Sequence, residues 1–166
     1  MANRYGSEYA MCIPGTGAAI TVKCGFRPKH IRVINISTAG KLEWFEGMAA
    51  GSAYKDKDGT AGEAGYTSII TSNGITVSDR SFVIGTDATN ATPTITTTAT
   101  GSKDSNSITV ASATNLVVGH TIYGAGIPAG TKITAISGKK ITLDGYLTAA
   151  MSNTACGVAN LAIFAE

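Results

Sequence analysis

The chain has 166 residues, of which 14% are charged, and its 13 basic and 11 acidic residues give a net charge of +2. The polar remainder is largely uncharged and includes 20 glycines, a composition that favours pleated strands and tight turns over helices. Helical bundles, coiled coils and charge-driven disorder are therefore excluded, and the sequence predicts an all-β protein.

The first half of the chain predicts an N-terminal arm followed by a β core. Residues 1–17 show no sustained period, and strands begin where apolar residues alternate with polar ones. Residues 30–36 carry apolar side chains in both phases, which predicts a central strand covered on both faces. Residues 47–65 predict an exposed loop, and Asn73-Gly74 between apolar runs predicts a hairpin turn. The strands expected here are 18–24, 30–36, 41–45, 66–71, 75–77 and 81–85.

The second half predicts a small module inserted into that core. Residues 86–106 are almost all small and polar and predict a linker with weak β character. Short strands bounded by turn residues follow, and the last strand, 158–164, is expected to lie beside 81–85 in one sheet. The strands expected in the module are 107–110, 115–119, 121–123, 132–136 and 140–143. The fold is thus predicted as an antiparallel β-sandwich or barrel core (18–90 plus 157–166) with a small β-barrel-like module (102–151) inserted before the last strand.

No motif in the sequence points to catalysis, a cofactor or a metal. The two histidines, His30 and His120, stand apart from any cluster, and a Ser-His-Asp triad, which depends on geometry, would have to use one of them. The glycines of 124–130 lack the Lys-Ser/Thr ending of a phosphate loop, and Asp56–Gly59 lacks the ligand spacing of an EF-hand. We expect no enzyme activity and no cofactor.

The sequence also lacks the features that mark several classes of partner. It has no basic stripe of the kind that binds nucleic acid and no apolar run of about 18 residues that would span a membrane. The N-terminus has no apolar signal-peptide core. Cys12, Cys24 and Cys156 are widely spaced and odd in number, which predicts buried free thiols in a protein made in a reducing cytoplasm.

Several runs of the sequence resemble small structural proteins of tailed-bacteriophage virions, some of which are head decoration (cement) proteins. These runs are Gly25–Asn35, Lys41–Met48, Ile69–Val77 and Phe82–Asp87. The glycine-rich run 118–131 resembles a small β repeat of phage and bacterial surface proteins. The resemblance implies a homotrimeric decoration protein on the outer surface of the capsid, made in the host cytoplasm, that binds and stabilises the shell of the major capsid protein. The alternative is a tail-fibre, spike or baseplate component that recognises a host receptor.

Contacts with the capsid or with other subunits are expected from the N-terminal arm and from two aromatic residues. Apolar side chains recur at odd positions of the arm, which suits a strand that adds to a neighbouring subunit or to the shell. The alternative is an arm that is disordered up to about residue 10. The candidate contact residues are Tyr5, Tyr9, Met11, Ile13, Trp44 and Phe45.

Overall fold

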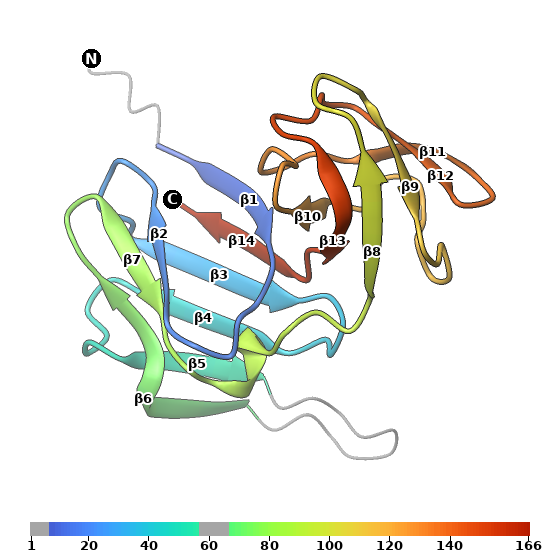
Figure 1. Cartoon of the computed structure of the whole chain (residues 1–166). Helices are drawn as coiled ribbons and strands as arrows, with labels where there is room; N and C mark the ends of the chain where they lie inside the picture. Colours follow the sequence, from blue (N-terminus) through green and yellow to red (C-terminus); the bar gives the residue numbers. More distant parts are fainter. Residues whose placement is uncertain (1–6, 57–66) are drawn as a thin grey trace, which may run out of the picture. The chain divides into compact units, whose positions relative to one another are not determined.

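The computed structural model describes residues 7–56 and 67–166, and it confirms the all-β prediction. These residues form curled antiparallel sheets and no α-helix; a single 3₁₀ turn, η1 (Ala88–Asn90), is the only helical element among them (Figure 1). The chain divides into two compact units. Unit 1 comprises Met1–Met11, Gly15–Thr92 and Asn160–Glu166, and unit 2 comprises Cys12–Pro14 and Pro93–Ala159.

Unit 1 is built on an eight-stranded sheet in which most neighbouring strands are also neighbours in the chain. Hairpins join β3 to β4, β4 to β5 and β6 to β7, whereas β1, β14 and β2 reach their places by longer connections. The spatial order is β1 (Tyr9–Ile13), β14 (Leu161–Ala165), β3 (His30–Asn35), β4 (Lys41–Phe45), β5 (Ser52–Asp56), β6 (Thr67–Val77), β7 (Ser81–Ile84) and β2 (Ile20–Lys23).

One face of this sheet carries the core of unit 1. Alternate residues of each strand point to it, as the two-residue period of a pleated strand requires. Phe82, Ile31 and Leu42 are fully buried there, and Trp44 is 5% exposed. The prediction that β3 is covered on both faces was wrong: Arg32, in the opposite phase, has an exposed side chain. The second face of β3 instead holds an ion pair, described below.

Two local predictions in unit 1 also fail. Residues 52–56, expected in a loop, form β5, while 57–65 lie outside the described residues. Asn73-Gly74 makes no hairpin: Asn73 does adopt a left-handed φ of 60°, but β6 continues through it and bends (Figure 1). Ala53 pairs with Ile70 and Ser52 with Ile75, so the intervening residues form a bulge that turns β6 from β5 toward β7.

The last strand has a different partner from the one expected. β14 pairs antiparallel with β3, Ile163 lying opposite Val33, and it is not a neighbour of β7. The expected strand 158–164 is interrupted at Asn160, which lies between β13 and β14. The buried side chain of Asn160 accepts a hydrogen bond from Gly15 N. Periodicity identified the strand and its buried face, but pairing with β3 depends on residues more than a hundred positions away.

Three buried asparagines hold together the segments of unit 1 that lie outside the ladder. Asn35 Nδ2 donates to Thr89 O at 2.9 Å, and Asn90 Nδ2 donates to Ala18 O at 2.6 Å. Asn160 Nδ2 donates to Ala91 O at 2.9 Å, so the chain leaves unit 1 after Thr92 and re-enters it at an adjacent point. The amides satisfy backbone groups that no strand pairs, which burial would otherwise make costly.

Unit 2 is a curled six-stranded sheet around its own core of 13 buried residues, among them Ile108, Ile133 and Leu147. A bridge between Thr121 and Lys132 joins the segments that precede the two edge strands, β10 and β11. The spatial order is β10 (Ile122–Gly124), β13 (Met151–Val158), β8 (Thr96–Gly101), β9 (Ser107–Val110), β12 (Lys140–Leu143) and β11 (Ile133–Ser137).

Unit 2 extends further along the chain than the module expected at 102–151. Residues 96–101, expected in a linker, form β8. This strand pairs with β13, a strand that the sequence analysis did not predict because its residues show no apolar alternation. Residues 115–119, expected as a strand, form a loop. A run of threonines is polar by composition, yet threonine suits a pleated strand once a partner strand supplies the ladder.

Candidate functional site

The side of the unit 1 sheet opposite the core carries large exposed side chains in register. We define the outer face as this side of β14, β3, β4, β5 and β6. A cross-strand row runs over it, formed by Phe164, Arg32, Glu43, Tyr54 and Ile69. Phe164 is 49% exposed and Ile69 is 64% exposed. Phe45 of the neighbouring row, also exposed, stacks on the His30 ring with centroids 4.8 Å apart. An ordered sheet thus holds several apolar groups in fixed positions at its surface.

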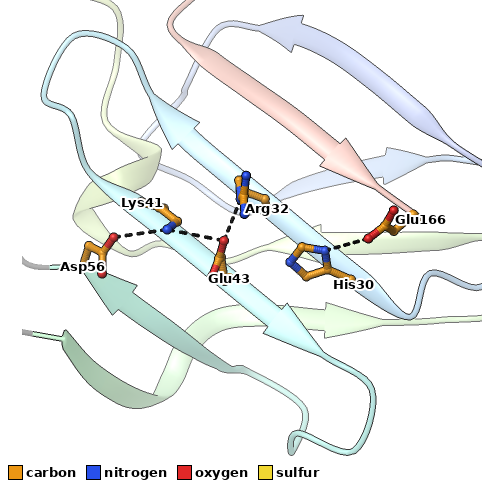
Figure 2. A network of polar contacts seen from close by, with 6 residues as sticks. All are labelled: His30, Arg32, Lys41, Glu43, Asp56 and Glu166. Atoms are coloured by element: carbon orange, nitrogen blue, oxygen red, sulfur yellow. Dashed lines mark hydrogen bonds and ion pairs between the residues drawn. The ribbon is translucent and has the colours of Figure 1, made fainter.

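A network of charged side chains occupies the middle of the outer face (Figure 2). Arg32 Nε donates to Glu43 Oε1 at 2.6 Å, and Lys41 Nζ lies 3.4 Å from the same oxygen. Lys41 Nζ also lies 3.3 Å from Asp56 Oδ2. The two cations and two anions of this network cancel, so the centre of the outer face is electrically neutral although it is rich in charged groups.

Glu43 is the anchor of that network. It is only 8% exposed, and burial by itself would raise its pKa. The hydrogen bond from Arg32 and the charge of Lys41 more than offset this effect, so the pKa of Glu43 lies below its ordinary value. A carboxyl whose pKa is lowered by folding stabilises the folded state above its unfolded pKa, and this stabilisation is lost as pH falls through the folded pKa.

Glu43→Gln is therefore expected to reduce the acid sensitivity of unit 1. At pH 7 the variant should have a free energy of unfolding about 1 kcal/mol lower than the wild type, because a charge-assisted hydrogen bond becomes a neutral one. The difference should shrink as the pH falls below 4.5, the ordinary pKa of a glutamate side chain. Urea titrations at pH 7 and pH 3, followed by tryptophan fluorescence, measure it. A difference that is the same at both pH values would contradict the assignment.

A pocket of about 360 Å³ lies in unit 1 where β1, β14 and β3 adjoin. His30 Nδ1 is 3.1 Å from Glu166 Oε1 (Figure 2). The backbone of Glu166 is held by hydrogen bonds with Lys29 and His30. The side chains that line it and carry charge, a hydrogen-bonding group or an aromatic ring are Glu8, Tyr9, His30, Arg32, Phe164 and Glu166.

The predicted contact residues have different outcomes. Trp44 is buried in the core, so its side chain is not available to another protein, whereas Phe45 is 46% exposed on the outer face. Tyr9, Met11 and Ile13 are half-buried in β1, the end strand of the sheet, which pairs with β14 along one edge. Their contact with another subunit or with the shell stays a prediction. Tyr5 lies outside the described residues.

Sequence reasoning missed the exposed residues Tyr54, Ile69 and Phe164. The signal for Phe164 was present, because it lies in the opposite phase to the buried residues Leu161 and Ile163. Tyr54 could not be placed in the same way, since the sequence predicts a loop over residues 47–65.

Groups that could ligate a metal or act as nucleophiles are dispersed over the described residues. These residues contain no cluster of three or more metal-ligating side chains, and within them neither imidazole is hydrogen-bonded to a hydroxyl or thiol. The three thiols are unpaired: Cys156 is buried, which raises its pKa to about 11, while Cys12 and Cys24 are half-buried. Cys156 therefore stays protonated and unreactive at neutral pH.

Comparison with known proteins adds no assignment. No family model matches the chain, and searches of curated proteins and of solved structures found no match. Within the described residues, no helix has the length and apolar character needed to cross a bilayer.

Proposed function

We propose that this chain is a structural protein of a tailed-bacteriophage virion, a decoration protein that binds the shell of the major capsid protein and stabilises it. The observation that carries the proposal is the outer face of unit 1, where exposed Phe45, Tyr54, Ile69 and Phe164 surround a neutral polar network. Aromatic residues and arginine are enriched in protein interfaces, and the balanced charges at the centre of this face let that centre approach another protein. The runs that resemble phage virion proteins support the same assignment.

A decoration protein acts through many copies, so each copy needs only moderate affinity. If three copies assemble as the homotrimer that the resemblance implies, the second and third contacts with the shell become intramolecular and strengthen retention without any new contact. A rigid sheet suits this role because little conformational entropy is lost when it binds.

A second candidate function is host recognition by a tail-fibre, spike or baseplate component. The observation that favours it is a set of exposed apolar side chains in two loops of unit 2, Val117, Val118 and Tyr146. Tyr146 is 66% exposed, more than any of the aromatic residues of the outer face. In this case unit 2, rather than unit 1, would carry the contact with the receptor.

The test compares these two surfaces with matched variants. Capsids of the parent phage that lack the protein are mixed with wild type, with Tyr54→Ser/Phe164→Ser, or with Val117→Ser/Tyr146→Ser, and bound protein is measured by co-sedimentation. We expect the unit 1 variant to bind at least about tenfold more weakly, since interface aromatics often contribute more than 1 kcal/mol each. The unit 2 variant should bind like the wild type.

The opposite pattern, or immunogold label on the tail instead of the head, would favour the second candidate. Absence of the protein from both capsids and tails would contradict both candidates. Because all four substituted side chains are exposed, near-ultraviolet circular dichroism should show that each variant keeps the wild-type fold.

A further inference from the structure

We infer that the pocket between β1, β14 and β3 binds a cationic side chain of a partner protein, with arginine as the best fit. This inference rests on the proposed function in one respect, since it takes the partner to be a protein that the outer face contacts. It specifies the chemistry that such a partner must present at this point.

The charges around the pocket leave an excess of negative charge. Arg32 lines the pocket, but its charge is compensated by Glu43, whose Oε1 accepts the Arg32 Nε hydrogen bond at 2.6 Å. Glu8 and Glu166 also line the pocket. When His30 is neutral, its contact with Glu166 at 3.1 Å is a hydrogen bond that leaves the carboxylate charged. With His30 neutral, the lining residues in the part of the chain that the structure describes therefore carry about two uncompensated negative charges.

The aromatic lining suits the same kind of ligand. Tyr9 and Phe164 line the pocket together with the two carboxylates. A cation placed on an aromatic face is attracted by the ring, and a guanidinium can stack on the ring while it donates two parallel hydrogen bonds to a carboxylate. A volume of about 360 Å³ has room for one long side chain, and it is near the lower end of the range for small-molecule sites.

The backbone of Glu166 is held in position before any ligand arrives, and its carboxylate has one contact, with His30. Glu166 N donates to His30 O at 3.0 Å, and Glu166 O accepts from Lys29 N and His30 N at 2.6 and 3.1 Å. The side chain in turn contacts His30, whose ring stacks on Phe45 at an interplanar angle of 10°. An acceptor fixed by its own backbone and by a stacked ring loses less entropy on binding than a freely rotating one.

The first experiment uses arginine as a defined probe. N-acetyl-arginine methylamide is titrated into the ¹⁵N- and ¹³C-labelled full chain, and the signals of Tyr9, His30 and Phe164 are followed by nuclear magnetic resonance. The neutral isostere N-acetyl-citrulline methylamide is the control ligand. We expect the arginine probe to bind about threefold to tenfold more tightly, the amount that two partly exposed charge contacts supply. Equal affinity of the two probes, or no shift at these residues, would overturn the inference.

The second experiment tests the carboxylates with variants of equal net charge. Glu8→Gln/Glu166→Gln should abolish the preference for arginine over citrulline. Glu46→Gln/Asp79→Asn removes two exposed carboxylates of unit 1 that do not line the pocket, and it should keep the preference. A similar loss in both variants would show a general charge effect and would contradict the site. Tighter binding of N-acetyl-glutamate methylamide than of the arginine probe would also contradict it, because Arg32 would then be the binding group.

These results can be separated from the test of the proposed function. Binding of the probe without binding to capsids would contradict the decoration role and keep the pocket. Binding to capsids that is unchanged in Glu8→Gln/Glu166→Gln, together with no probe binding, would contradict the pocket and keep the decoration role.

Discussion

Asn90→Ala is expected to lower the free energy of unfolding of unit 1 by about 3 kcal/mol. The Asn90 side chain is fully buried, and its Oδ1 accepts a hydrogen bond from Thr16 N at 3.2 Å. Its Nδ2 donates to Ala18 O at 2.6 Å and to Gly85 O at 3.0 Å. Alanine would remove this partner from Thr16 N, Ala18 O and Gly85 O, and the loss of each partly buried hydrogen bond costs about 1 kcal/mol.

The single tryptophan makes this prediction measurable on one unit at a time. Trp44 is the only tryptophan of the chain and lies in the core of unit 1, so its fluorescence during urea unfolding reports that unit. Asn106→Ala, at an exposed position of unit 2, is the control and should change this transition by less than about 0.5 kcal/mol. A transition of Asn90→Ala that matches the wild type would show that water or a rearrangement replaces the amide.

The same asparagine illustrates what sequence patterns can and cannot reveal. Asn35-Ile36-Ser37 and Asn90-Ala91-Thr92 match a glycosylation triplet, but both asparagines are fully buried and bonded to backbone groups. A short motif records residue types at a spacing and carries no information about burial. The partners of Asn90 lie as far as 74 residues away, beyond the reach of any local pattern.

Turn chemistry predicted local geometry better than it predicted topology. The expected strands 30–36 and 41–45 do pair as the β3–β4 hairpin, which the turn at 38–40 closes with Ala39 at a φ of 58°. Asn73 adopts the left-handed conformation that its residue type favours, yet the surrounding strand re-forms its ladder and the turn becomes a bulge. The difference lies in the flanking partners, because β5 and β7 both offer edges to β6 and pairing with them satisfies more backbone groups than a hairpin would.

One part of the candidate site could be predicted from local turns, and another part could not. The Arg32–Glu43 pair follows from the hairpin register, since a turn at 38–40 places residues 32 and 43 opposite each other. The pocket does not follow in this way, because it needs Glu8 and Glu166 beside His30, and these residues come from opposite ends of the sequence. Non-local strand pairing, here β1 with β14 and β14 with β3, is the step that periodicity leaves undetermined.

Gly15→Ala is expected to destabilise unit 1 strongly, because it adds a methyl group beside the asparagine network. A Cβ at Gly15 would overlap the backbone oxygen of Ala91 and would lie 3.2 Å from Asn90 O. Gly15 N donates to Asn160 Oδ1 at 2.7 Å, so moving this segment away to relieve the overlap would also break a buried hydrogen bond. Because the obstacle is backbone rather than a flexible side chain, we expect a loss of at least about 3 kcal/mol.

Gly17→Ala, two residues further on, is the matched control for Gly15→Ala. Gly17 has a φ of 70°, but an added Cβ would meet nothing within 4 Å. Alanine there incurs only the strain of a left-handed backbone, about 1 kcal/mol. The two variants, compared by urea unfolding with Trp44 fluorescence, separate a steric cost from a conformational one. Equal losses would mean that the segment at Gly15 can move away from Ala91, and that the asparagine network does not hold it rigidly.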